Sequence, residues 1–125
     1  MATKIVDFAQ AAEMVDGDKD FYLELTEIFF GEYDNLRQSI EVAIQQKNAK
    51  ELNQSAHTAK GALGNLCAIS ARDLASKLEL MGVKANFDDA ESIFASFCAA
   101  VDEYRKLVAE IRISDLWERS LGTST

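Results

Sequence analysis

The sequence predicts an all-α fold: an antiparallel up-and-down four-helix bundle with a short extra helix at its N-terminus. The 125 residues contain no proline and only six glycines, so few residues interrupt a helix. Apolar residues recur at steps of three and four over long stretches, which places them on one face of each helix. The connections between these stretches are short, so successive helices should be antiparallel neighbours.

The first two predicted helices are separated by the sequence Asp16-Gly17-Asp18. A short amphipathic stretch from Ile5 to Val15 precedes it, and a long helical pattern from about Lys19 to Gln46 follows. Gly31 lies inside the long pattern, where a glycine costs about 1 kcal/mol relative to alanine. We therefore expect a kink or a break there. The apolar positions of this pattern are Phe21, Leu25, Ile28, Phe29, Leu36, Ile40 and Ile44.

The third predicted helix begins at Asn48, because Glu51 three residues later completes a capping-box pattern, and it runs to about Leu66. Ser70 and Asp73 are predicted to mark the start of the fourth helix. Short connections near Lys47, Ala68 and Ala85 separate the long helices.

The last long helix is predicted to begin at Asp88, with Glu91 three residues later. Ser114 to Thr125 is expected to be a loosely attached tail, although Leu116 and Trp117 could dock on the bundle. The apolar stripe of this helix is Phe94, Phe97, Val101, Tyr104, Val108 and Ile111, a spacing typical of a bundle seam.

Length and charge limit the possible functions. The chain should form one domain over residues 1–125, with a core at about 18–113 and a tail at 114–125. The net charge of −8 argues against binding to duplex nucleic acid or to an anionic membrane. No apolar run approaches the roughly 18 residues of a membrane-spanning helix, and no secretory signal precedes Phe8. We expect a soluble, cytoplasmic monomer, and Met1 together with the lack of a linker favours a free-standing protein.

The two cysteines, Cys67 and Cys98, are too few for a disulfide framework and too far apart for a paired-cysteine metal site. Both lie in apolar stretches expected to be helical, where a free cysteine usually behaves as a small buried apolar residue. This usage is typical of a reducing compartment.

His57, the only histidine, is predicted to point to solvent. At about 100° per residue, the apolar residues of its helix cluster on the face away from the imidazole. That buried face contains Leu52, Ala56, Ala59, Leu63 and Leu66. The residues within about 60° of His57 on the helical wheel are Lys50, Asn53, Gln54, Lys60, Gly61 and Gly64.

Gly61 and Gly64 lie four and seven residues after His57, and each weakens the helix by about 1 kcal/mol. No packing requirement at a solvent-facing position explains that loss. Two glycines do leave a bare strip of backbone beside the imidazole, open to a phosphoryl group or to another protein. Lys60 supplies a mobile cation, and an exposed histidine, largely neutral at pH 7, is nucleophilic at a ring nitrogen. Together these features describe a covalent carrier of an anionic group.

The segment His57-Thr58-Ala59-Lys60-Gly61-Ala62-Leu63-Gly64 resembles the H-x-x-K-G-x-x-G signature of histidine-containing phosphotransfer (Hpt) domains. The resemblance extends over roughly residues 21–113 and implies a four-helix bundle with the active histidine on an exposed face. It implies reversible phosphorylation of Nε2 of His57, with the phosphoryl group coming from a receiver-domain aspartate of a hybrid sensor kinase. The group would then pass to the aspartate of a response regulator. Lys60 would be the phosphate-side cation, and Gly61 and Gly64 would give the receiver room to dock.

Further expectations follow from this resemblance. The sequence has no ATP-binding loop pattern, so we expect no autokinase activity and no cofactor of the chain's own, the Mg²⁺ belonging to the receiver. Gln54 is predicted to hydrogen-bond the ring or the phosphate, and Asn53 to assist docking. Lys77 and Lys84 on the next helix could flank the site, although a solvated surface is the simpler interpretation.

Two positions depart from the family's usual pattern. Ala59 stands where a larger aliphatic residue is common, which shortens one core contact. Cys67 stands where many members have glycine, which affects packing or docking near the end of the helix. A redox-sensitive thiol at Cys67 is an alternative to simple burial.

A calcium site is a competing interpretation of the acidic residues near the start of the long helix. Asp16, Asp18, Asp20 and Glu27 match positions 1, 3, 5 and 12 of an EF-hand loop. Phe21, however, stands where that loop requires glycine, and the helical pattern already begins near Lys19. Acidic residues that favour a helix N-terminus explain the run better.

Two other function classes compete with the carrier. One is a non-catalytic helical interaction or dimerisation module in which His57 is incidental. The other is a hydrolytic enzyme, which we disfavour because no titratable group lies at a spacing that would pair with His57. Ser55 and Thr58 point to other faces of the helix.

Overall fold

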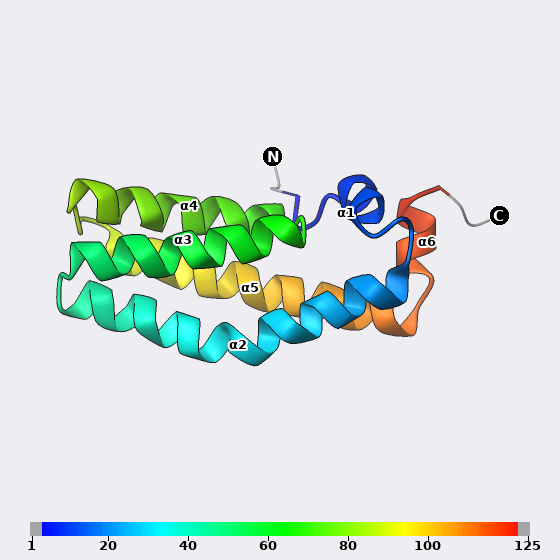
Figure 1. Ribbon diagram of the computed structural model, residues 1–125, viewed down its shortest axis with the longest axis horizontal. Coiled ribbons are helices and arrows are strands. Elements are labelled where there is room, and N and C mark those ends of the chain that lie inside the picture. Colours follow the sequence, from blue (N-terminus) through cyan, green and yellow to red (C-terminus); the bar gives the residue numbers. More distant parts are fainter. Residues whose placement is uncertain (1–3, 123–125) are drawn as a thin grey trace.

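The computed structural model describes residues 4–122, and every regular element in that range is a helix. Four long helices lie side by side, and two short ones lie together at one end of them (Figure 1). The helices are α1 (Phe8–Met14), α2 (Lys19–Gln45), α3 (Ala49–Asn65), α4 (Ile69–Lys84), α5 (Ala90–Ile113) and α6 (Leu116–Ser120). The predicted bundle with a short N-terminal helix is confirmed. Met1 and the last three residues of the predicted tail lie outside the described residues.

The starts of the first three helices follow from their capping residues. The Asn48 side chain accepts a hydrogen bond from the backbone N–H of Glu51 at 3.1 Å, as the sequence predicts for α3. The Glu51 carboxylate does not return to Asn48 but accepts from Ser55 Oγ at 3.1 Å. Asp7 and Asp18 cap α1 and α2 in the same way.

The predicted starts of α4 and α5 are wrong. α4 begins directly after Ala68, so Ser70 lies in its first turn and no side chain caps the helix. The Ala68 carbonyl accepts from the Arg72 N–H at 2.9 Å, which is the first backbone bond of α4, so the helix has already started at Ile69. α5 begins after Asp89, not after Asp88, and Asp89 adopts a left-handed conformation with φ of +64°.

Gly31 does not break the long helix. α2 continues through it as a single helix of 27 residues, and the helix bows near its middle (Figure 1). Gly31 is exposed, and no atom would lie within 4 Å of a Cβ added to it. The only cost of Gly31 is therefore its low helix propensity, and the packing of the turns on either side of it keeps the helix continuous.

Four helices, α1 to α4, end in the same turn, with a residue other than glycine in the left-handed conformation. At the end of α3, Cys67 has φ of +56°, and the pair of bonds Cys67 N–H to Gly64 O and Ala68 N–H to Leu63 O forms a Schellman motif. Asp16, Lys47 and Ala85 occupy the equivalent position after α1, α2 and α4. This left-handed conformation favours glycine, the residue that the family resemblance leads us to expect at this position. Cys67 is therefore in a turn, not within a helix as we predicted.

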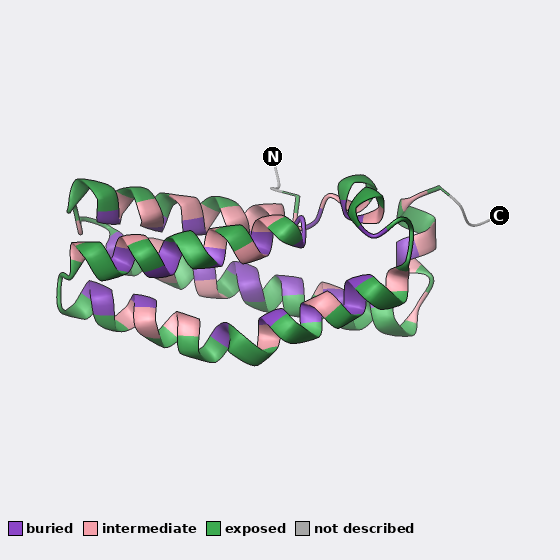
Figure 2. Ribbon diagram, in the orientation of Figure 1, coloured by how far each residue is buried: buried purple, intermediate pink, exposed green. Residues whose placement is uncertain are grey.

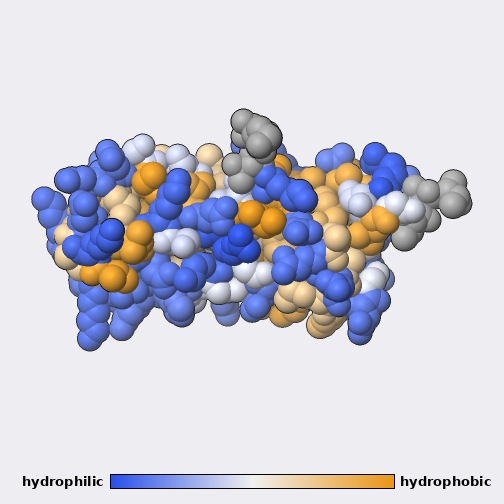
Figure 3. All heavy atoms as spheres, turned by 90° about the horizontal axis from the view of Figure 1, so that it is seen from above, coloured by the Kyte–Doolittle hydropathy of each residue, from blue (hydrophilic) through white to orange (hydrophobic). Residues whose placement is uncertain are grey.

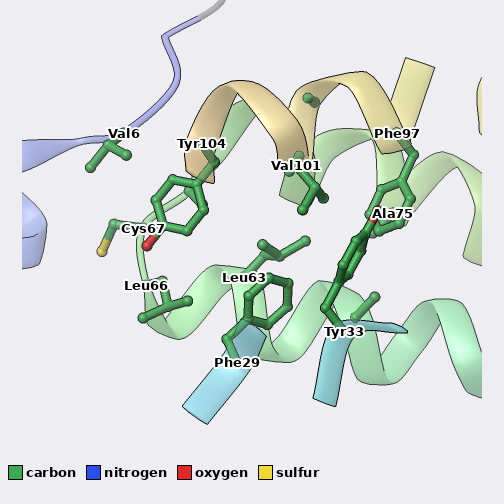
Figure 4. Packing of buried hydrophobic residues seen from close by; sticks show 14 of the residues in the cluster. Val6, Phe29, Tyr33, Leu63, Leu66, Cys67, Ala75, Phe97, Val101 and Tyr104 are labelled. Atoms are coloured by element: carbon green, nitrogen blue, oxygen red, sulfur yellow. The ribbon is translucent and has the colours of Figure 1, made fainter. Parts of the chain in front are cut away.

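The core lies between the four long helices. Buried residues occupy the helix faces that point inward, and exposed residues cover the outer faces (Figure 2). The close-up shows side chains from α2, α3 and α5 meeting around Leu63 (Figure 4). Ala59 is fully buried in this core, as the helical wheel predicts.

A buried hydrogen-bond chain holds the end of α3. The Tyr22 hydroxyl donates to the Leu66 carbonyl at 2.6 Å and lies 2.7 Å from the Tyr104 hydroxyl. The Asp7 N–H donates to the carbonyl of Cys67 at 3.0 Å. Groups from α2 and the N-terminal segment therefore satisfy carbonyl groups exposed where α3 stops, and Tyr104 of α5 supports the Tyr22 hydroxyl.

Part of the predicted tail docks on the bundle. Trp117 in α6 is only 2% exposed, and its ring centroid lies 5.1 Å from that of Tyr22 and 6.2 Å from that of Phe8. Lys19 and Glu118 form an ion pair at 3.1 Å. The short helices α1 and α6 thus close the end of the bundle at which α3 terminates (Figure 1).

α3 and α4 approach each other closely at Gly82. A Cβ added to Gly82 would lie 2.5 Å from Asn53 N and 2.9 Å from Ala49 O, both backbone atoms. Only glycine permits this approach. The close packing fixes the position of every α4 side chain relative to α3, which carries His57.

Candidate functional site

His57 projects from α3 with 68% of its side chain exposed, as the helical wheel predicts. Its Nδ1 atom contacts Oε2 of Glu79 on α4. The other carboxylate oxygen of Glu79 accepts a hydrogen bond from Lys60 Nζ at 2.5 Å. In the described part of the chain, Nε2 of His57 has no hydrogen-bond partner.

Glu79 determines the electrostatics of this cluster. Its side chain is only 16% exposed, and the Lys60 ammonium, with a smaller contribution from His57, holds the pKa of its carboxyl group below the usual value. Glu79 is thus ionised at neutral pH, and a carboxylate only accepts hydrogen bonds. The proton of a neutral His57 ring therefore belongs on Nδ1, which leaves the lone pair on Nε2.

Our prediction that no titratable group pairs with His57 is wrong. It considered spacing within one helix, and Glu79 lies on the next. His57 and Glu79 are each eleven residues from Ala68, where the chain turns between the two helices. Residues equidistant from the turn of an antiparallel helix pair lie side by side, so counting outward from the predicted turn would have found Glu79.

The two glycines differ in their surroundings. Gly61 is exposed, and no atom lies within 4 Å of where its Cβ would be, so the backbone beside His57 is bare. Gly64 is partly covered, since Arg72 Cδ would lie 3.7 Å from its Cβ. Arg72, a cation near the site that sequence reasoning missed, also pairs with Asp73 at 3.1 Å.

The structure does not bring the remaining predicted residues onto the ring. The Gln54 side chain is exposed and makes no hydrogen bond to His57 among the described residues; its backbone carbonyl accepts from Thr58 Oγ1 at 3.0 Å. Asn53 is partly buried at the contact with Gly82 instead of lying on the open strip. Lys77 and Lys84 are exposed on α4, and within residues 4–122 neither forms an ion pair.

An apolar groove of about 190 Å³ lies next to His57, between α2 and α3. Thr58, directly after His57, forms part of its wall, and Ile28, which is 63% exposed, forms part of the opposite wall. The surface seen from the α4 side mixes hydrophilic and hydrophobic residues (Figure 3). The groove is lined by Leu25, Ile28, Phe29, Glu32, Leu36, Thr58, Ala62, Asn65 and Leu66.

The charge on α3 and α4 differs from that of the whole chain. These two helices hold Lys50, Lys60, Arg72, Lys77 and Lys84 against Glu51, Asp73 and Glu79. Five basic against three acidic side chains give these two helices a small positive balance, whereas the net charge of the whole chain is −8.

The acidic run that resembled a calcium loop does not form one. Asp18 caps α2 by accepting from Phe21 N–H at 3.0 Å, and Asp20 is already helical. Within residues 4–122, no group of three or more His, Cys, Asp or Glu side chains is placed to hold a metal ion. Over the same range, no helix is long and apolar enough to cross a membrane.

Comparisons with known proteins place this chain in a family. Residues 24–113 match the Hpt domain family. The chain belongs to the Hpt domain family. This Hpt domain is 28% identical, over 88 residues, to the phosphorelay intermediate protein YPD1 of Candida albicans. The match covers 68% of this chain and 48% of that protein, so the Hpt domain spans about half the length of its relative. No solved structure matches with significance.

Proposed function

We propose that this chain is a phosphorelay intermediate. It accepts a phosphoryl group on Nε2 of His57 from a receiver-domain aspartate of a hybrid sensor kinase and passes it to the aspartate of a response regulator. The observation that carries this proposal is the state of the ring: Glu79 engages Nδ1, whereas Nε2 is open on a side chain that is 68% exposed. The match to a phosphorelay intermediate supports it.

The chemistry of each step is a reversible transfer. The lone pair on Nε2 attacks phosphorus, and the bond from phosphorus to the aspartate oxygen breaks with its electron pair left on the carboxylate. The ring keeps its Nδ1 proton and becomes cationic, so its hydrogen bond to Glu79 becomes charge-assisted. The second transfer reverses these changes. We place the Mg²⁺ on the receiver, where it would neutralise charge on the phosphoryl oxygens.

Lys60, Gly61 and Gly64 have supporting roles in the proposal. Lys60 lies one turn from His57, and its ammonium can reach a group on Nε2. The uncovered backbone at Gly61 lets the receiver bring its aspartate close to the ring. The positive balance of α3 and α4 suits a partner whose active site is acidic, and the apolar groove would take apolar side chains of the receiver.

The decisive experiment is phosphoryl transfer from a receiver domain, phosphorylated by acetyl phosphate with Mg²⁺, to the wild-type chain and to His57→Gln. We expect acid-labile, base-stable label on the wild type and none on the variant. A parallel incubation with ATP and Mg²⁺ alone should leave both unlabelled, because we propose that the chain has no autokinase activity. If several receivers, including one from a hybrid kinase, fail to label the wild type, the interaction-module interpretation replaces this one.

The docking role of the groove has its own test. Ile28→Ser removes an exposed apolar side chain from the groove wall, and Ile113→Ser removes one that is 84% exposed at the end of α5. Both variants should retain parental stability to within about 0.5 kcal/mol. Only Ile28→Ser should raise the receiver concentration needed for half-maximal transfer. Equal effects of the two substitutions would rule out the groove as the docking site.

A further inference from the structure

Lys60 and His57 share a single carboxylate. Glu79 Oε1 holds Lys60 Nζ at 2.5 Å, and Oε2 of the same group contacts Nδ1 of His57. The Lys60 side chain is 35% exposed, so it has free space around it, whereas Glu79 is largely enclosed between the two helices. In the unphosphorylated chain the ammonium that would assist a phosphoryl group is therefore already bound.

Phosphorylation would give Lys60 a second anionic partner. Lys60 follows His57 by three residues and so lies on the same face of α3. Its flexible stem allows the ammonium to reach Glu79 or a group on Nε2. The Glu79 carboxylate is held by the close packing of α4 on α3 and remains bound to Nδ1 of the cationic ring. The lysine is the member of the cluster that can change partner.

We propose that Glu79 competes with the phosphoryl group for Lys60 and thereby sets how strongly His57 holds that group. This inference rests on the proposed function. A lysine bound only to the phosphoryl group would stabilise the loaded state and oppose the onward transfer that an intermediate must perform. The Glu79 carboxylate offsets this because it continues to attract the Lys60 ammonium and so weakens the pairing of Lys60 with the phosphoryl group. The phosphorylated chain therefore remains able to pass that group on.

The test is a double-mutant cycle on the equilibrium constant for transfer from a phosphorylated receiver domain to this chain. The four proteins are the wild type, Glu79→Gln, Lys60→Met and the double variant. Glutamine retains an oxygen that can accept from Nδ1 but loses the charge that holds the lysine, and methionine retains the apolar stem without the ammonium. Any change at the ring itself occurs in both proteins that carry the Glu79→Gln substitution and cancels in the cycle.

Competition predicts that Glu79→Gln favours the phosphorylated chain more when Lys60 is present than when it is absent. Glu79→Gln should raise the equilibrium constant for transfer to this chain about three- to tenfold more with Lys60 present than in the Lys60→Met background. This is the size expected for moving one charge by a few ångströms at a partly exposed site. Asp73→Asn removes a carboxylate from the same helix that pairs with Arg72 and not with Lys60. In a matching cycle it should give a ratio of about one.

Each result decides the matter. A ratio of about one in the Glu79 cycle, or a ratio below one, overturns the competition while the proposed function stands, since the wild type is still labelled. A wild type that takes no label from any receiver overturns the proposed function, and this inference falls with it. A Glu79 ratio of about three or more, with an Asp73 ratio of about one, establishes the competition.

Discussion

Replacing Gly82 by alanine should destabilise the protein, although alanine is the better helix former. The new Cβ would lie 2.5 Å from Asn53 N and 2.8 Å from Asn53 Cα, whereas ordinary contacts begin at 3.4 Å. The two helices must therefore separate locally by about 0.9 Å, because backbone atoms within a helix cannot move independently. Glu79 lies one turn earlier on α4, so the same separation would pull its carboxylate away from His57.

The magnitude follows from two opposing contributions. Alanine favours the helix by about 1 kcal/mol over glycine. Overpacking costs about 1–3 kcal/mol, and contacts with rigid backbone place this site at the upper end. The net loss in the free energy of unfolding should be about 1–2 kcal/mol, a fall in Tm of about 4–8 °C. Gly61→Ala is the matched control: it meets no atom within 4 Å and should stabilise the protein by about 1 kcal/mol.

Urea unfolding followed by circular dichroism measures both variants, and phosphoryl transfer assays measure the site. Gly61→Ala should be more stable than the parent yet slower in transfer, because its methyl group covers the bare strip beside His57. Gly82→Ala should be worse in both respects. If Gly82→Ala were as stable as the parent, the close approach of α3 and α4 described above would be wrong.

Three further predictions concern stability. Ala85→Gly should stabilise the protein by about 1 kcal/mol in urea, because this exposed residue has a φ of +52°; a loss of stability would contradict the left-handed assignment. The pKa of Glu79 is lowered by folding, so its stabilising effect is complete above the unfolded value of 4.5 and is lost as the pH falls through the folded-state pKa. The difference in unfolding free energy between the parent and Glu79→Gln should therefore become smaller as the pH falls through the folded-state pKa of Glu79. A difference that does not change with pH would contradict the stabilising effect of the Glu79 carboxylate. Tyr22→Phe should cost about 1–3 kcal/mol, since it leaves the Leu66 carbonyl and the Tyr104 hydroxyl unpaired, and Tyr104→Phe should cost less in the same assay.

Much of the fold could be predicted because its determinants are local in sequence. Apolar residues at steps of three and four identify the long helices without reference to their partners. The Asn48 cap fixes the start of α3 by a bond to a residue three positions away. No side chain caps α4 or α5, and there the capping patterns in the sequence predicted the wrong first residue. The geometry of the preceding turn determines where these two helices start.

The same distinction applies to the site. The exposure of His57 and the bare backbone at Gly61 follow from the periodicity of one helix, and the sequence alone predicted both. The sequence also predicted the family through the spacing of its histidine, lysine and glycines. Each of these features is a property of a single helix, where neighbours three and four residues apart must share a face.

Only the tertiary structure decided which groups meet across two helices. It placed Glu79 on Nδ1 of His57, paired the same carboxylate with Lys60 and set Gly82 against Asn53. These contacts depend on the register and separation of α3 and α4, which the turn around Cys67 and the packing of many side chains fix together. The sequence determined that the imidazole of His57 faces solvent, and packing determined which of its nitrogens contacts Glu79.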